Sequence, residues 1–424
     1  MLDLSPWISA GTGVWWSQTS AEPTPLVHAL LDQANTLTDG SGPVRAFCGM
    51  SWDERLTTAL PESVELSSYG SLGRLRTLSR TGRLRVIPCH YSALPDLFAT
   101  GAIPADVGFV QVSAPDAEGW CSLGVGVDYV ADAVEHTPVL IAEINRQMPV
   151  TAGGPRLHVD RFAAVVESDR PLPTAPQRVP DDIDRTIARH VAGLIDDGDT
   201  FQIGVGTLPS AVLECLAGHT DLGVHSGMIA DGVMTLIDAG VVTGARKEID
   251  TGLVVTGAAL GTTRLYDAIP RLPLRFRAAS YTHSPAVLSR LDRFVAVNSA
   301  IEVDLTGQVN AEVARGVHIG AVGGQVDFSR AASTTGARSI IALRATSRTE
   351  STIRAALSGP ITTARSDIDV VVTEHGVAHL RGVDLDERAR RLVAIAAPEH
   401  RDTLERSLAG APSALTITSA GRTP

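Results

Sequence analysis

Short apolar segments alternate with amphipathic ones along most of the chain, and this alternation constrains the fold more than any other feature. Residues 138–142 (PVLIA) form a continuous apolar run, and residues 23–37 place Leu26, Leu30 and Leu31 on one helical face. Continuous apolar runs are typical of strands buried on both faces, as in parallel sheets covered by helices. The pattern therefore predicts an α/β fold built from βαβ units.

The same reasoning predicts further elements along the chain. A second helix is expected at residues 231–239, with Asp231 as its N-cap and Gly240 just beyond its C-terminal end. Another helix is expected at residues 209–216. Strands are expected at residues 44–50, 84–91, 107–113, 201–206, 222–226, 294–297, 339–343 and 368–372.

A proline-rich segment divides this alternating pattern into two parts. Residues 167–182 carry four prolines among polar residues, and proline neither continues a helix nor donates to a sheet ladder. A chain of 424 residues is also too long for one ordinary core. We therefore expect two α/β domains, residues 1–180 and residues 181–424. Their cores should be aliphatic, because aromatic residues make up only 4% of the sequence.

The charge and the cysteine spacing of the sequence argue against several kinds of partner. The net charge is −11 and no basic run is present, which argues against a nucleic-acid partner. No apolar run reaches membrane-spanning length, and the N-terminus lacks the pattern of a signal peptide. We therefore expect a cytoplasmic protein without a membrane partner. No spacing indicates a metal site, and reduced thiols are expected at the four scattered cysteines, Cys48, Cys89, Cys121 and Cys215.

Two glycine turns could bring backbone amides close to a ligand. Gly204 and Gly206 lie between a predicted strand and a predicted helix, where free amides can approach a phosphate or an oxyanion. A tight βα turn that needs glycine only for its backbone conformation is the alternative. In the second turn, Gly323 and Gly324 precede Gln325, so the backbone can approach a ligand while the side chain fixes its surroundings.

The second turn also allows a purely structural reading. Asp327 follows the paired glycines by a few residues, and an aspartate in this position could cap the next helix. The two readings are compatible with each other.

Several motifs occur together and in a fixed order. The central one is residues 222–232, LGVHSGMIADG, and the others are residues 113–124, 202–209, 297–309, 323–328 and 373–382. In this order they resemble the acetyl-CoA hydrolase/transferase family, which includes 4-hydroxybutyrate CoA-transferases. The resemblance covers nearly the whole chain.

This resemblance has consequences for fold, ligand and assembly. It implies two open α/β domains of the CoA-transferase type with an active-site cleft between them. It implies acyl-CoA as substrate, a carboxylate or other acyl acceptor as a second partner, no metal, and a homodimer. It also implies that coenzyme A binds at Gly204, Gly206, Gly323, Gly324 and Gln325.

Gly227 departs from the family pattern. By resemblance this position carries the glutamate that attacks the thioester, and glycine has no side chain with which to form that covalent intermediate. In one explanation, water or a substrate carboxylate enters the vacated space while His225, Glu118 or Asp231 assists as a base. The product is then a free acid or a new acyl compound. In a second explanation, Glu118 or Asp116 is the nucleophile instead.

Two further explanations remain open. The protein could bind acyl-CoA without turnover. Alternatively, Gly227 could be an engineered substitution in an orthodox CoA-transferase.

Overall fold

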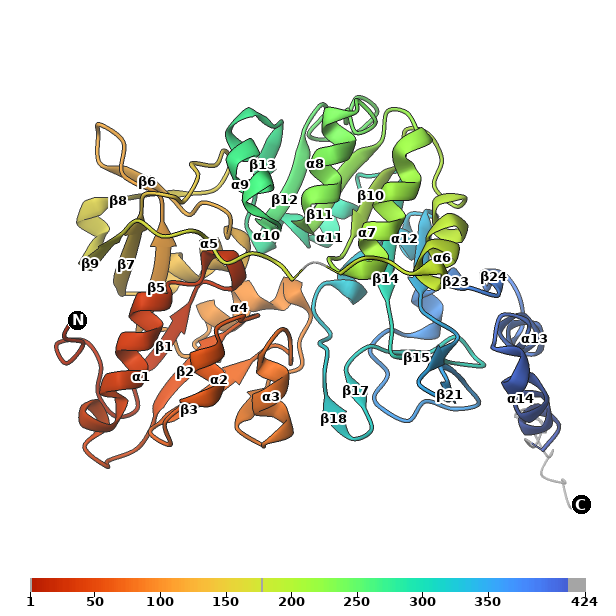
Figure 1. Cartoon of the computed structure of the whole chain (residues 1–424), viewed down its shortest axis with the longest axis horizontal. Helices are drawn as coiled ribbons and strands as arrows, with labels where there is room; N and C mark the ends of the chain where they lie inside the picture. The colour runs from red at the N-terminus through yellow and green to blue at the C-terminus, as the bar shows by residue number, and fades with distance from the viewer. Residues whose placement is uncertain (1, 177, 411–424) are drawn as a thin grey trace, which may run out of the picture.

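Two parallel sheets, one from each half of the chain, form the frame of the molecule (Figure 1). The computed structural model describes residues 2–176 and 178–410. In the first sheet, with seven strands, every pair is parallel. The strands run in the order β4 (Leu84–Val86), β3 (Val64–Ser68), β2 (Val44–Cys48), β1 (Gly13–Trp16), β5 (Val107–Val112), β7 (Val139–Asn145) and β9 (Phe162–Ser168).

The second sheet has eight strands, and only its last pair, β23 with β24, is antiparallel. The strand order is β13 (Leu274–Phe276), β12 (Val254–Ala259), β11 (Gly223–Ile229), β10 (Thr200–Ile203), β14 (Phe294–Ser299), β19 (Arg338–Ala342), β23 (Val370–Thr373) and β24 (Gly376–His379). The remaining short strands are β6 (Trp120–Ser122), β8 (Arg156–His158), β15 (Glu302–Asp304), β16 (Val309–Asn310), β17 (Val313–Ala314), β18 (Val317–His318), β20 (Thr346–Ser347), β21 (Glu350–Ser351) and β22 (Ile353–Arg354).

Helices connect the strands of both sheets, as the alternating pattern predicts. In the first half they are α1 (Thr24–Thr38), α2 (Glu54–Thr58), α3 (Leu75–Arg80), α4 (Leu94–Ala99) and α5 (Asp128–Ala133). In the second half they are α6 (Asp182–Ala192), α7 (Thr207–Cys215), α8 (Asp231–Asp238), α9 (Thr263–Ala268), α10 (Ala279–Thr282), α11 (Pro285–Leu288), α12 (Gln325–Thr334), α13 (Leu385–Ala394) and α14 (Pro398–Gly410).

The predicted mixed α/β class is confirmed, with corrections at two helix ends. Gly240 follows α8 with a φ of +72°, as expected of a residue that ends a helix. Asp231 is the first residue of α8 rather than its N-cap, which is Ala230. The carboxylate of Asp231 instead accepts a hydrogen bond from the backbone N–H of Thr262, so a tertiary contact has replaced the local cap.

Asp327 differs from its predicted capping role in a similar way. The N-cap of α12 is Gly324, and Asp327 lies inside the first turn. Its carboxylate accepts hydrogen bonds from the backbone N–H of Ser92 (3.1 Å) and from the Ser92 hydroxyl (2.6 Å). Asp327 therefore joins the second half of the chain to the first.

Backbone hydrogen bonds also join the two halves directly. The N–H of Ser71 donates to the carbonyl of Gly320 (2.8 Å), and the N–H of Tyr91 donates to that of Gly323 (2.9 Å). A second group comprises Val127 N–H to Gly257 O (3.0 Å) and Ala259 N–H to Val125 O (2.9 Å). The largest apolar cluster also contains residues of both halves, from Trp15 to Val372. The apolar interior is therefore continuous across the junction. It is not purely aliphatic as predicted, because the rings of Trp15, Phe47, Phe98 and Tyr129 pack together within it.

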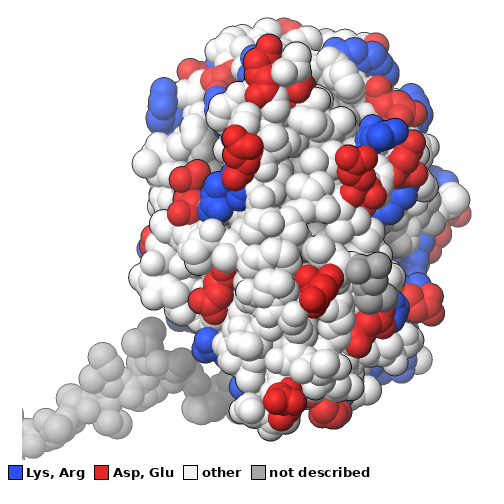
Figure 2. Space-filling model, turned by 90° about the vertical axis from the view of Figure 1, so that its left-hand side faces the viewer, with Lys and Arg blue, Asp and Glu red and all other residues white. Residues whose placement is uncertain are grey.

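The surface and the cysteines add three observations. On the face in Figure 2, the acidic and basic side chains of the described residues are interspersed, with no continuous basic patch. All four cysteines are free thiols. Within residues 2–176 and 178–410, no helix is both long and apolar enough to cross a membrane.

Glu22 provides a pH-dependent test of the fold. Its side chain is buried and accepts hydrogen bonds from the indole N–H of Trp16 (3.1 Å) and the hydroxyl of Ser51 (2.8 Å). Burial raises the pKa of Glu22 from 4.5 to about 8. The folded protein therefore binds this proton more tightly than the unfolded chain does. The contribution of Glu22 to the free energy of unfolding is fully present below pH 4.5 and is lost as the pH rises through 8.

We expect Glu22→Gln to remove this contribution, because an amide keeps the shape of the neutral acid and does not ionise. The free energy of unfolding should be measured by urea denaturation between pH 5 and pH 8. Its decrease with pH should be smaller in Glu22→Gln than in the unsubstituted protein. Glu135→Gln, at an exposed position, is the control. Parallel pH curves for Glu22→Gln and the unsubstituted protein would contradict the prediction.

Candidate functional site

A cavity of about 140 Å³ lies at the junction of the two halves and is lined by residues from both. The first half contributes Tyr91 and Asp128, among others. The second half contributes Gly204, Gly227, Gly323, Gly324 and Gln325. The structure thus brings four of the five predicted coenzyme A-binding residues and the predicted catalytic position into one place.

The parallel sheet explains why these glycines meet. Gly204 follows the carboxyl end of β10, and Gly227 lies near the carboxyl end of the neighbouring strand β11. Ligands of parallel α/β sheets bind at this edge. Gly323 has a φ of +52°, a conformation that favours glycine, and Gly324 is the N-cap of α12. The N–H of Gly324 makes no hydrogen bond to any described residue.

Gly227 faces a histidine ring instead of open space. A Cβ atom built on Gly227 would lie 2.8 Å from Cε1 and 2.9 Å from Nε2 of His283. A Cβ atom on Gly324 would lie 2.5 Å from the same Nε2. Such distances are too short for real side chains, so the imidazole occupies space that any larger residue at either position would need.

His225 does not line the cavity. Its side chain is fully buried, and its Nε2 lies 3.1 Å from the carbonyl oxygen of Thr282. Because a carbonyl only accepts, Nε2 carries the proton in this bond. Burial, together with the nearby ammonium of Lys247, lowers the pKa of His225 to about 4. His225 is therefore a neutral support for the segment that carries His283.

The other predicted bases lie elsewhere. Glu118 and Asp116 are exposed on the loop before β6, do not line the cavity, and Asp116 pairs with Arg156. The structure does not bring either of the two carboxylates that were considered as alternative nucleophiles to the junction cavity. Asp231 and Gly206 line a different cavity, described below.

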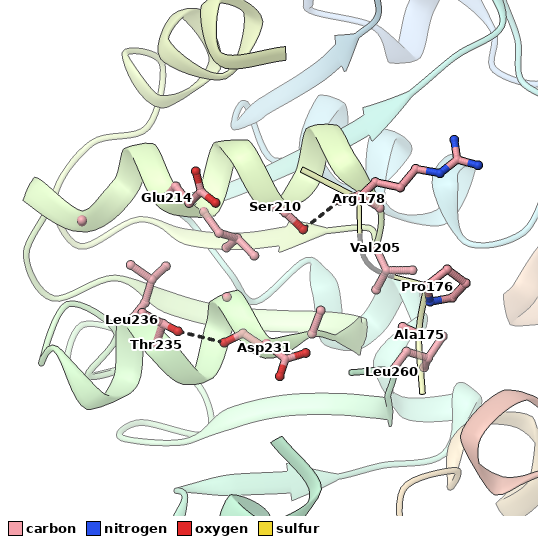
Figure 3. Close-up of a pocket in the computed structure, with 15 residues that line it drawn as sticks. Ala175, Pro176, Arg178, Val205, Ser210, Glu214, Asp231, Thr235, Leu236 and Leu260 are labelled. Carbon is pink, nitrogen blue, oxygen red and sulfur yellow. Dashed lines mark hydrogen bonds between the residues drawn. The ribbon is translucent and has the colours of Figure 1, made fainter. Parts of the chain in front are cut away.

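That second cavity, of about 460 Å³, opens between α7 and α8 (Figure 3). Ser210 and Glu214 reach it from α7, and Asp231 and Thr235 from α8. Leu260 lines both cavities, so the two are neighbours. The glycines of the Gly323–Gly324 turn line only the smaller cavity at the junction, which is why we take that cavity as the candidate site.

Asp128 is the carboxylate that the sequence motifs did not identify. It is buried at the start of α5, lines the junction cavity, and accepts a hydrogen bond of 2.7 Å from the Gln18 amide. Burial raises the pKa of Asp128 to about 6. In sequence it is an ordinary acidic residue in the first turn of a helix, so no local signal distinguishes it. Nowhere in the described residues do three or more His, Cys, Asp or Glu side chains form a group that could hold a metal ion.

Comparison with known proteins gives consistent matches. The model of the acetyl-CoA hydrolase/transferase N-terminal domain matches residues 3–175, and that of the C-terminal domain matches residues 261–408. The 4-hydroxybutyrate coenzyme A transferase of Clostridium kluyveri is 39% identical over 78% of this chain and 79% of its own.

Two solved structures resemble the fold closely. The crystal structure of RipA from Yersinia pestis superposes with a TM-score of 0.89 at 32% identity, covering 96% of this chain and 95% of RipA. The 4-hydroxybutyrate CoA-transferase of Porphyromonas gingivalis superposes with a TM-score of 0.79 at 34% identity, with the same coverage of 96% and 95%.

The contact between Gly227 and His283 can be tested by measuring the free energy of unfolding of variants. We expect Gly227→Ala to destabilise the protein by about 1–3 kcal/mol, because the added methyl group overpacks the site. In a His283→Ala background the same substitution should cost less, with a coupling energy of about 0.5–3 kcal/mol. Urea denaturation of the four proteins measures both quantities. Additive effects would show that the two residues do not touch.

Proposed function

Because the chain belongs to the acetyl-CoA hydrolase/transferase family, we propose that it acts on an acyl-CoA thioester in the junction cavity. We further propose that no glutamyl-CoA intermediate forms at position 227. Water gives a free acid and coenzyme A, whereas another acyl acceptor that enters the cavity gives a new acyl compound. Hydrolysis is the simpler of these reactions, since it needs only water as the second substrate.

One observation carries this proposal: Gly227, which has no side chain, lines the same cavity as the Gly323–Gly324 turn. The free N–H of Gly324 is available to a developing oxyanion. A preorganised donor of this kind contributes about 10²–10³ in rate. An unpaired backbone donor and a position without a carboxylate together support thioester chemistry that does not pass through a covalent intermediate at position 227.

The alternative carboxylate nucleophiles have weaker support. Glu118 and Asp116 lie outside the cavity, as described above. Asp128 lines it, but one of its oxygens accepts from the Gln18 amide and the other from the backbone N–H of Val130 (3.3 Å). Both oxygens are thus already engaged as acceptors.

A non-catalytic acyl-CoA-binding protein is the second candidate. It is favoured by the His283 ring, which fills part of the space beside Gly227 and could limit how closely a thioester approaches. Family resemblance also leads us to propose a homodimer, and the charge, cysteine and apolar patterns of the sequence lead us to propose a cytoplasmic location.

A thiol-release assay separates the candidates. We expect acyl-CoAs of increasing chain length to release free coenzyme A without an added carboxylate, because water is the nucleophile. Borohydride should trap no thioester on the enzyme, because Gly227 cannot form one. Strict dependence on an acceptor carboxylate would instead indicate transfer. Binding of coenzyme A in calorimetry without any turnover would identify a binding protein and contradict the proposed enzyme activity.

A further inference from the structure

His283 is the one imidazole that lines the junction cavity. It follows α10 directly and is 4% exposed. Its Nε2 lies between Gly227 and Gly324, 2.9 Å and 2.5 Å from the positions that their Cβ atoms would take. The ring therefore reaches the space that a side chain from position 227 would occupy, but from a different element of the fold.

The hydroxyl of Thr282 lies beside two groups. It is 3.2 Å from the carbonyl oxygen of Ala278, which can only accept, and 2.8 Å from Nδ1 of His283, whose role depends on the tautomer of the ring. We assign the hydroxyl proton to the carbonyl, so that Nδ1 donates to the hydroxyl oxygen and Nε2 carries the lone pair. Nε2 makes no hydrogen bond to any residue that the structure describes.

Packing holds the ring in this orientation. Tyr91, from the first half of the chain, lies 4.6 Å from the imidazole between ring centroids, and Phe328 lies 4.7 Å away. His225 holds the preceding residue, because it donates to the backbone carbonyl of Thr282. The ring is thus packed between two aromatic side chains and lines the cavity, where it can receive a proton.

We propose that His283 is the catalytic base of this site and that it deprotonates the water that attacks the thioester. The inference rests on the proposed function. The water oxygen forms a bond to the carbonyl carbon, and its proton moves to Nε2. The carbon–sulfur bond then breaks, the electron pair leaves with sulfur, and the imidazolium returns the proton to the thiolate. Acyl-CoA and water thus become a carboxylic acid and free coenzyme A.

Burial and the neighbouring His225 lower the pKa of His283 to about 3, so the ring is neutral at pH 7. A low pKa makes the ring a weak base, so the assignment rests on the position of Nε2 at the cavity. A ring with so low a pKa would be expelled before a thiolate if it attacked the thioester itself. For that reason we assign His283 as a base acting through water and not as a nucleophile. Its conjugate acid is strong enough to protonate the departing thiolate.

The test compares three variants with the unsubstituted protein. His283→Ala removes the base, and His283→Asn keeps a polar group at the position of Nδ1 without the base. His379→Ala removes an exposed imidazole on β24 as the control. General base catalysis contributes about 10²–10⁴ in rate. We expect kcat/KM for thiol release to fall by this factor in both His283 variants and to be unchanged in the control.

Two further measurements separate a chemical role from a structural one. Affinity for coenzyme A in calorimetry and the midpoint of thermal unfolding should change little in His283→Asn. Added imidazole should restore part of the turnover of His283→Ala, since it can enter the space left by the ring.

The outcomes distinguish this inference from the proposed function. If the unsubstituted protein releases no thiol from any acyl-CoA, the proposed function fails. If it is active and both His283 variants keep its rate, the proposed function stands and His283 is not the base. If turnover and coenzyme A binding are lost together in both variants, His283 has a structural role and the inference is overturned.

Discussion

The candidate site exists only because the two halves of the chain dock against each other. Neither half contains the cavity alone: Tyr91 and Asp128 come from one, and the glycine turns and His283 from the other. Backbone hydrogen bonds fix the docking, with Tyr91 N–H on Gly323 O and Val127 N–H on Gly257 O. Side-chain contacts across the junction, such as that of Asp327 with Ser92, and the shared apolar cluster add to these main-chain hydrogen bonds.

The docking also explains why glycine is needed at particular positions. At Gly257, an added Cβ atom would lie 2.9 Å from the carbonyl oxygen of Gly227 and 3.2 Å from Cβ of Asp128. At Gly70, it would lie 2.2 Å from the Cβ atom of Ala321, across the same junction. Bulk at either position would separate the halves and open the cavity. The junction glycines therefore serve close approach between segments that are distant in sequence.

Much of the fold followed from local patterns, because buried parallel strands and amphipathic helices have distinct periodicities. The glycine turns at Gly204 and Gly323 were also recognisable, since turns at the ends of strands have local signatures. His283 and Asp128 were not, because their importance arises only when the two halves dock. Asp231 and Asp327 were assigned local capping roles for the same reason, and both instead bond to residues distant in sequence.

Gly227 and His283 are best understood as alternatives for the same space. A carboxylate at position 227 would bring a second acid into a cavity where burial already raises the pKa of Asp128 to about 6, and it would collide with the imidazole. A neutral ring avoids both the repulsion and the cost of burying another charge. With the ring in its observed position, a side chain at position 227 would require His283 to shift, so the proposed base catalysis depends on glycine at this position.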